Sequence, residues 1–252
     1  MPRQARVKSE TGIYHLLLRG INKQNIFEDE EDKKRFLETL NYYKRISRYL
    51  LYGYCLMDNH IHLLIQEREE SISRIIKRIS SSYVHWYNQK YMRCGHLFQE
   101  RFKSEAVETE DYFLVVLRYI HQNPVKAGVT NATNKYIWSS YHDYVENSGI
   151  TNIDLALDIF LKDRTKAVEL FINYHNESNS DQCLEYLEKI VMSDQAVMNY
   201  LNEMGITSIS QLQQLNKELR NEVIRKIKTI EGITIRQLAR MTGIAKSVIN
   251  RV

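Results

Sequence analysis

The stretch Met57-Asp58-Asn59-His60-Ile61-His62-Leu63-Leu64-Ile65 decides our interpretation of the fold. Side chains alternate between the two faces of a strand, so His60 and His62 leave one face while Ile61 turns into a core on the other. Two imidazoles on one face form half of a metal site. Taken alone, the pair is more often two polar side chains on the wet face of an antiparallel strand. A second element has to decide between these interpretations.

That second element is the apolar stretch that begins at Asp111 and ends at Pro124. Asp111 predicts the N-cap of a helix, and Pro124 predicts its end because proline lacks a backbone donor. Tyr119 and Asn123 are four residues apart and are therefore neighbours on one helical face. A phenol and an amide oxygen are thus presented together, and we expect them to meet the histidine pair.

The segments around these two elements predict an α+β fold. We expect strands at residues 13–18, 49–57, 60–65 and 104–107, and helices at 30–48, 71–90 and 111–123. Asp58-Asn59 has the composition of a tight turn, which predicts a hairpin. The order β-α-β-β-α-β is that of a ferredoxin-like antiparallel sheet with helices, the split βαβ unit, here with the helix at 111–123 appended.

Composition divides the 252 residues into three regions. Residues 1–145 hold 22 basic and 17 acidic residues, residues 146–210 hold 4 and 11, and residues 211–252 hold 9 and 3. Everything beyond Asn147-Ser148-Gly149 has helical patterning, which predicts an all-helical C-terminal region. We therefore expect an N-terminal domain, an acidic helical linker and a basic helical end, with these boundaries. Basic surfaces favour polyanions such as nucleic acid.

The last thirty residues predict a helix-turn-helix. Thr234 caps a helix at residues 235–242, Gly243 makes a turn, and a second helix begins at Lys246. In that arrangement Lys246, Asn250 and Arg251 face a DNA groove. Any helical hairpin can mimic this pattern, so the same helices also suit contacts between protein chains.

Other features limit the class of protein. The cysteines Cys55, Cys94 and Cys183 are far apart, which suggests neither a disulfide framework nor a structural zinc site. No apolar run approaches the ~20 residues that span a bilayer, and no signal segment opens the chain. We expect a cytoplasmic protein without membrane contact. Its oligomeric state stays open, a homodimer included.

A mixed basic and aromatic loop lies at residues 95–103. Such composition can hold a phosphate backbone and stack bases, which favours single-stranded nucleic acid. The candidate DNA-binding residues in the first 145 positions are Arg19, Phe98, Arg101, Lys103 and Arg118.

Residues 1–145 resemble the single-tyrosine HUH transposases, in particular the REP-associated tyrosine transposases of the IS200-like group. The matching blocks are Pro2-Arg3, Tyr14-His15 with Arg19-Gly20, residues 57–64, 95–103 and 118–128, and Trp138-Ser139-Ser140-Tyr141. Members often have glutamine where this chain has Asn123, and proline where it has Asp58. The C-terminal region lies outside the resemblance.

The resemblance implies a function and assigns its residues. Tyr119 is implied as the nucleophile, with His60, His62 and Asn123 as ligands of a divalent metal, Mg²⁺ or Mn²⁺. It implies cleavage and rejoining of single-stranded or hairpin DNA through a 5′-phosphotyrosine. Two imidazole ligands favour manganese slightly.

Three alternatives remain open at this point. Tyr112 lies seven residues before Tyr119, on roughly the same helical face, and competes with it as nucleophile. The chain is alternatively a non-catalytic helix-turn-helix regulator derived from a transposase. A replication or relaxase-type HUH nuclease would have nearly the same chemistry. The target sequence, and whether the protein mobilises itself or another element, are not readable from the residues.

Overall fold

The computed structural model describes residues 6–185, 192–230 and 232–252. The chain divides into two units, residues 1–185 (unit 1) and residues 186–252 (unit 2), and each is considered by itself. Pro2-Arg3 lies outside the described residues. The acidic region expected at 146–210 does not form a separate unit, because helices within it pack against the domain that precedes them.

Unit 1 contains a four-stranded antiparallel sheet. Its strands are β1 (Ile13–Arg19), β2 (Leu50–Met57), β3 (His60–Gln66) and β4 (Lys103–Ala106). Their order across the sheet is β2-β3-β1-β4, and every neighbouring pair is antiparallel. The expected hairpin is present, since Asp58 and Asn59 form the turn between β2 and β3. The structure thus confirms the α+β class and the order of elements predicted from the sequence.

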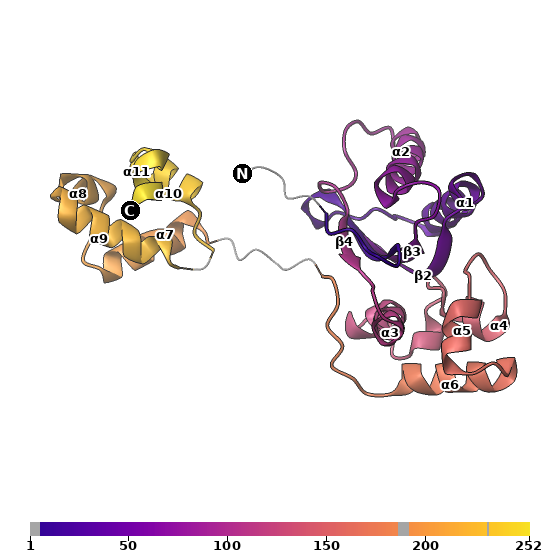
Figure 1. The fold of residues 1–252 in the computed structure, drawn as a ribbon. Helices are drawn as coiled ribbons and strands as arrows, with labels where there is room; N and C mark the ends of the chain where they lie inside the picture. The colour runs from indigo at the N-terminus through magenta and orange to yellow at the C-terminus, as the bar shows by residue number, and fades with distance from the viewer. Residues whose placement is uncertain (1–5, 186–191, 231) are drawn as a thin grey trace. The chain divides into compact units, whose positions relative to one another are not determined.

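Two long helices cover one face of this sheet (Figure 1). They are α1 (Glu30–Ser47), which follows the short 3-10 helix η1 (Ile21–Lys23), and α2 (Ile72–Lys90). Asp29 caps α1 in a reciprocal arrangement with Asp32, which satisfies backbone donors that a helix start leaves free. Buried side chains of both helices, such as Phe36 and Ile79, meet those of the strands, including Ile61.

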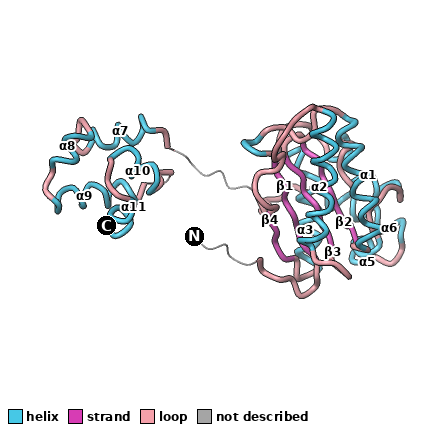
Figure 2. Tube along the Cα trace, turned by 90° about the horizontal axis from the view of Figure 1, so that it is seen from above, coloured by secondary structure: helices cyan, strands magenta, loops and turns pink. Residues whose placement is uncertain are grey.

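The opposite face is also covered, as Figures 1 and 2 show. Its helices are α3 (Glu110–Lys126), the 3-10 helix η2 (Thr133–Lys135), α4 (Tyr141–Glu146), α5 (Asp154–Phe160) and α6 (Arg164–Asn176). Helix α3 lies directly on the strands, and Val116 and Leu117 share one buried cluster with Leu64 of β3. The histidine face of β3 is therefore enclosed and not wet.

The ends of α3 differ from those predicted. Thr109 is the N-cap, where Asp111 was expected, because its hydroxyl accepts from the Tyr112 N–H at 3.2 Å. Pro124 lies inside the helix instead of ending it. Its ring removes only its own donor, and the next turn still closes through the Ala127 N–H to the Asn123 carbonyl at 2.9 Å.

Close contact between α3 and β2 leads to a test of the fold. A Cβ added to Gly53 would lie 2.8 Å from Leu117 Cδ1, which is too close for an undisturbed contact. We expect Gly53→Ala to lower the free energy of unfolding by about 1–3 kcal/mol, measured by urea denaturation, because the buried Leu117 side chain has to move or α3 has to shift. Gly53→Val should cost more. Equal stability of both variants and wild type would contradict the close approach.

The two edge strands of the sheet are protected from further strand pairing in different ways. On the β2 edge, the Leu56 N–H donates to the Trp138 carbonyl and the Ser140 N–H donates to the Tyr54 carbonyl, at 2.9 and 3.0 Å. The connection between η2 and α4 therefore covers that edge. On the other side, β4 is only four residues long and carries the charged Lys103 and Glu105.

Unit 2 is helical throughout its described residues. Its helices are α7 (Asp194–Glu203), α8 (Ile209–Gln214), α9 (Lys217–Lys228), α10 (Ile235–Thr242) and α11 (Lys246–Arg251). They share a core of their own that includes Leu201, Leu238 and Ile249. Thr234 caps α10 as predicted, and Gly243 takes a left-handed φ of 68° at the turn into α11. Across the described chain, none of the helices is both long and apolar enough to cross a membrane.

Candidate functional site

The histidines of β3 face helix α3. His60 Nε2 lies 3.1 Å from Asn123 Oδ1, and His60 Nδ1 lies 2.6 Å from Asn59 Oδ1. The Asn59 side chain therefore fixes the imidazole from behind, while the other nitrogen points to the helix. His62 is 2 % exposed, and its ring meets that of His60 edge to face at 5.1 Å between centroids. The fold thus brings His60, His62 and Asn123 together across the interface between β3 and α3.

Tyr119 enters the same interface from α3. Its ring lies 5.7 Å from that of His62 and 5.9 Å from that of His15, in both cases near perpendicular. Its hydroxyl donates a hydrogen bond to Glu185 Oε1. Burial first, and the Glu185 carboxylate second, raise the pKa of the Tyr119 phenol. The phenol is therefore protonated at neutral pH and has a carboxylate acceptor in contact.

His15 and Glu105 continue the site behind His62. His15 Nε2 lies 3.0 Å from His62 Nδ1, and its ring is fully buried between β3 and β4. Glu105 Oε2 lies 3.8 Å from His15 Nδ1. Burial lowers the pKa of both imidazoles, that of His62 most strongly. These rings are neutral at physiological pH and keep a nitrogen lone pair for a metal ion or a hydrogen bond.

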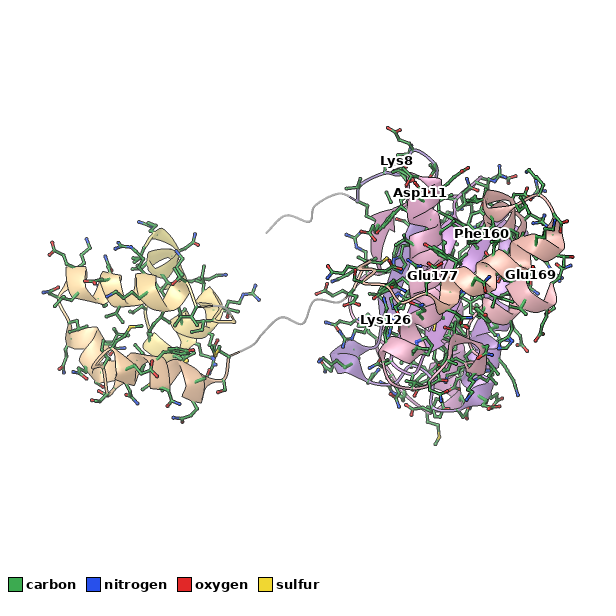
Figure 3. All side chains as sticks on the ribbon, turned by 90° about the horizontal axis from the view of Figure 1, so that it is seen from below. Lys8, Asp111, Lys126, Phe160, Glu169 and Glu177 are labelled. Atoms are coloured by element: carbon green, nitrogen blue, oxygen red, sulfur yellow. The ribbon has the colours of Figure 1, made fainter. Side chains whose placement is uncertain are left out.

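Residues 177–185, which we call the covering segment, close the site from outside. Arg118 holds Asp181 with two hydrogen bonds, Nε to Oδ2 at 2.8 Å and Nη2 to Oδ1 at 3.0 Å. Lys126 donates to the Asp181 carbonyl at 3.1 Å, and Lys103 donates to the Glu185 carbonyl at 3.2 Å. Figure 3 shows Asp111 and Lys126 at opposite ends of α3, with Glu177 beside the helix. This segment puts the Glu185 carboxylate on Tyr119.

Arg118 therefore stands apart from the other candidate DNA-binding residues. It is 7 % exposed, and its guanidinium lies 3.9 Å from the Tyr174 ring centroid in addition to its pair with Asp181. A bidentate pair of this kind holds both groups firmly. The structure uses Arg118 to fasten the covering segment, and Arg118 does not line the groove formed by the loop at residues 95–103.

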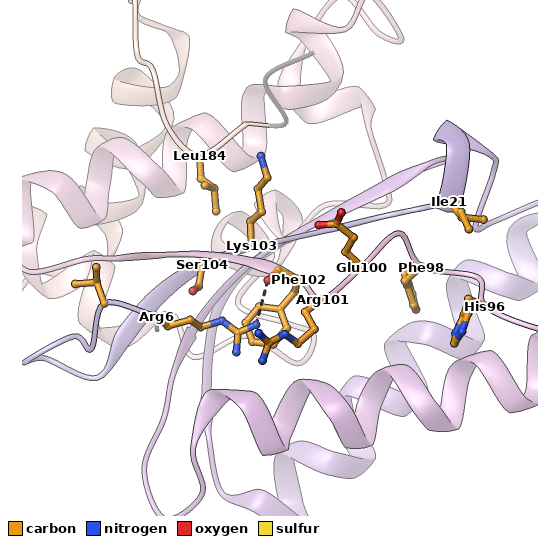
Figure 4. Close-up of a pocket in the computed structure, with 11 residues that line it drawn as sticks. Arg6, Ile21, His96, Phe98, Glu100, Arg101, Phe102, Lys103, Ser104 and Leu184 are labelled. Carbon is orange, nitrogen blue, oxygen red and sulfur yellow. Dashed lines mark hydrogen bonds between the residues drawn. The ribbon is translucent and has the colours of Figure 1, made fainter. Parts of the chain in front are cut away.

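That loop lines a groove of about 1060 Å³ beside β4. Its walls include Phe98, Arg101, Phe102, Lys103 and Arg6. The Arg6 guanidinium lies over the Phe102 ring at 3.6 Å from the centroid and donates to the Phe102 carbonyl at 3.1 Å. Figure 4 shows Arg6, Arg101 and Phe102 gathered in one part of the groove, with Phe98 and His96 farther along it.

Arg19 reaches the same loop from the end of β1. The Gln99 N–H donates to the Arg19 carbonyl at 2.7 Å, and the Ile21 N–H donates to the Leu97 carbonyl at 2.9 Å. A second hollow of about 440 Å³ lies between this loop and α2, with Arg19 and Lys77 in its wall. The fold therefore places Phe98 and Arg101 in the walls of both hollows, with Arg19 in one and Lys103 in the other, whereas contact of these residues with DNA stays a prediction.

The three C-terminal candidates lie on α11 in unit 2. Lys246, Asn250 and Arg251 are exposed, while Ile249 between them is fully buried in the core of this unit. One face of α11 is thus exposed, whereas its use in binding DNA stays a prediction.

Two further buried histidines make the stability of unit 1 depend on pH. His121 Nδ1 and His175 Nε2 are 2.9 Å apart, and burial lowers the pKa of His175 to about 3 and that of His121 well below 6.5. Between pH 6.5 and the lowered pKa values of the folded protein, these two histidines bind protons only in the unfolded chain. The stability that their neutral forms contribute is therefore complete above pH 6.5 and is lost as the pH falls. Each ring contributes up to ~1.4 kcal/mol per pH unit.

We expect the thermal midpoint of wild-type protein to fall between pH 7 and pH 5, a range in which few carboxylates titrate. His175→Leu should show a shallower dependence, because one of the titrating rings is gone. A wild-type midpoint that stays constant over this range would contradict the prediction.

The sequence analysis assigned no role in the site to three of its residues, namely His15, Glu105 and Glu185. His15 carried a signal, because it shares the face of β1 that meets His62 once β1 and β3 are paired. Glu105 pairs with His15 across β1 and β4. Nothing in the sequence connects Glu185 with Tyr119.

Described side chains include no group of three or more His, Cys, Asp and Glu residues that could hold a metal ion. The proposed ligands His60, His62 and Asn123 are not a group of that type, because the third ligand is the amide oxygen of an asparagine.

Comparison with known proteins gives matches to a family and to solved structures. Residues 8–123 match the family model described as "Transposase IS200 like". A solved REP-associated tyrosine transposase bound to a REP hairpin is 16% identical with a TM-score of 0.52, over 62% of this chain and 96% of that one. This likeness supports the fold.

A putative transposase from Deinococcus radiodurans R1 is 14% identical over 45% of this chain and 92% of that one, at a TM-score of 0.35, which is too low to bear on the fold. The curated proteins contain no match. The family-model match covers the domain that holds the histidine pair, Tyr119 and Asn123, and it makes residues 8–123 similar to the IS200-like transposase family.

Proposed function

We propose that the chain cleaves and rejoins single-stranded DNA, with Tyr119 as the nucleophile and a divalent metal ion held by His60, His62 and Asn123. One observation carries the proposal: a phenol, two neutral imidazoles and an amide oxygen meet at one interface, although they come from a strand and a helix far apart in the sequence. A cluster with a purely structural role would not require these groups to keep lone pairs available for a metal ion.

The donor set suits a divalent ion. His60 Nε2 and Asn123 Oδ1 are 3.1 Å apart and face each other, so both are ready to turn toward a shared ion. Imidazole nitrogen with amide oxygen suits Mn²⁺ somewhat better than Mg²⁺, which prefers oxygen alone. When bound, the ion would neutralise charge that develops on the scissile phosphate.

The residues of the chain account for the covalent step. Tyr119 Oη attacks phosphorus, and its proton passes to the Glu185 carboxylate that already accepts it in a hydrogen bond. The bond from phosphorus to the 3′-oxygen breaks, and that oxygen takes a proton from water. The products are a 5′-phosphotyrosine and a free 3′-hydroxyl. The covalent link keeps the energy of the phosphodiester, so a second 3′-hydroxyl can reverse the step without ATP.

The groove beside β4 suits the DNA strand. Arg6, Arg101 and Lys103 offer positive charge, and Phe98 and Phe102 offer aromatic rings, within one hollow. Charge along a backbone path with rings for stacking is how proteins bind single strands. The resemblance to a transposase solved with a REP hairpin supports a hairpin with a single-stranded flank as the substrate.

The decisive experiment looks for the covalent intermediate. Purified protein is incubated with Mn²⁺ and single-stranded hairpin DNA that is labelled on the 3′ side of the cleavage position. We expect a labelled protein band that survives denaturation, and peptide mapping should locate the label on Tyr119. Absence of any adduct, with duplex and hairpin binding intact, would favour the alternative of a non-catalytic DNA-binding regulator.

The structure of unit 2 suggests a second DNA contact, whether or not the chain cleaves DNA. Helix α10, the left-handed turn at Gly243 and helix α11 form a helix-turn-helix outline with Lys246, Asn250 and Arg251 exposed on its last helix. We propose that this surface binds double-stranded DNA.

Binding of the full chain to duplex DNA at several salt concentrations tests this surface. The double variant Lys246→Ala with Arg251→Ala should reduce the salt slope by about 2, since each lost phosphate contact removes ~0.9. Lys217→Ala, an exposed lysine at the start of α9, is the matched control. Equal loss in the control would argue against a specific surface.

A further inference from the structure

Glu105, His15 and His62 form a polar chain in which the two imidazoles are within hydrogen-bond distance and the Glu105 carboxylate faces His15 at 3.8 Å. Glu105 pairs with His15 across β4 and β1, and His15 packs against His62 of β3 with ring centroids 5.2 Å apart. The two imidazoles meet through His15 Nε2 and His62 Nδ1 at 3.0 Å. One of these nitrogens has to carry a proton and the other a lone pair, so the chain has a direction.

The far end of the chain sets that direction. His15 Nδ1 and Glu105 Oε2 are both buried, neither atom has a hydrogen-bond partner, and they face each other at 3.8 Å. Contact with His15 is the largest cause that lowers the pKa of Glu105, so this group is a carboxylate at neutral pH. A carboxylate offers only negative charge and lone pairs, so at this distance it favours the tautomer of His15 that turns an Nδ1–H toward it. The opposite tautomer would turn a lone pair toward the negative charge in a buried place.

We propose that Glu105 and His15 are positioning residues that hold His62 in the tautomer with its proton on Nδ1. His15 Nε2 then accepts from the His62 Nδ1–H, and His62 Nε2 keeps its lone pair for the metal ion of the proposed function, on which this inference rests. Reversal of the chain would protonate His62 Nε2 and remove it as a ligand. The role of the pair is to select a tautomer, in addition to filling the core.

The tautomer can be measured without metal or DNA. Protein with ¹⁵N-labelled histidine is examined by long-range ¹H–¹⁵N correlation, and the signals of His62 are assigned by their absence in His62→Ala. We expect Nδ1 to be protonated and Nε2 to be unprotonated in metal-free wild type. Protonation of Nε2 in that sample would overturn the proposal.

Variants test the two members of the chain. Glu105→Gln should mix the two tautomers of His62 and weaken the binding of Mn²⁺, measured by calorimetry, by about 10- to 100-fold. Glu108→Gln removes a carboxylate three residues away that bonds the Ser9 hydroxyl instead, and it should change neither property. An unchanged tautomer ratio in Glu105→Gln would overturn the proposal.

The middle member allows a rescue experiment. His15→Leu fills the space but offers His62 no acceptor, and should lose the tautomer preference and Mn²⁺ affinity together. His15→Gln keeps an oxygen acceptor and should recover both in large part, whereas equal behaviour of the two variants would contradict a hydrogen-bonding role. Because the tautomer is measured in metal-free protein, failure of wild type to cleave DNA would overturn the nuclease proposal alone.

Discussion

Tyr119→Phe is expected to lose DNA cleavage by ~10³-fold or more, because the variant lacks the only oxygen that the proposed mechanism places against phosphorus. The ring itself should stay in place, since its contacts with His62 and His15 do not involve the hydroxyl. Binding of hairpin DNA should therefore persist while both the covalent adduct and the cleaved product disappear. Gel analysis of labelled DNA measures the two together.

Tyr112→Phe is the matched control for this variant. Tyr112 lies on the same helix and its pKa is also raised, first by burial and then by Glu105, so it resembles Tyr119 in environment. It should cleave as wild type does. Full activity of Tyr119→Phe, or loss of activity only in Tyr112→Phe, would move the nucleophile to the other tyrosine or out of this helix.

His60→Ala carries the second large expected effect. The variant removes the imidazole that faces Asn123 at 3.1 Å, and with it one of the two nitrogen donors of the proposed metal site. We expect Mn²⁺ affinity, measured by calorimetry, to fall by more than ~100-fold, with a parallel loss of cleavage, since removal of an outer partner alone already costs 10- to 100-fold. Chelation of the metal in wild type should have the same effect on cleavage.

His85→Ala serves as the control for removal of a histidine. His85 is exposed on α2, and its replacement should leave both Mn²⁺ binding and cleavage at the level of wild type. Asn123→Gln separately tests the third ligand, because it keeps an amide oxygen and should retain more affinity than Asn123→Ala. If His60→Ala bound Mn²⁺ as tightly as wild type does, His60 would not be a ligand and the proposed metal site would be refuted.

Local patterns predicted the fold well because its elements are strongly periodic. The alternation around Ile61 and the turn at Asp58-Asn59 gave the hairpin, and the order of the remaining elements gave the sheet class. Among the expected elements, the ends of helix α3 differ most, because Pro124 is inside it and Thr109 is its cap. A proline in a last turn removes a single backbone donor, so packing of the helix on the sheet outweighs it. Such packing is not visible in a sequence window.

The candidate site was likewise predicted in part from local patterns. Two short-range rules paired His60 with His62 and Tyr119 with Asn123, and the fold brings these pairs together. His15 and Glu105 join the site through strand pairing, and Glu185 joins it through the covering segment, so the sequence alone did not connect them with it. Arg118 illustrates the limit, because its basic character suggested a phosphate partner whereas its actual partner is Asp181, far along the chain.

The borders of the sheet bear on how this protein behaves at high concentration. Exposed strand borders are where folded chains join one another and aggregate. Here the β2 border is occupied by the peptide groups around Trp138 and Ser140, and the β4 border is short and charged. Association of copies by adding strand to strand is thereby disfavoured in unit 1.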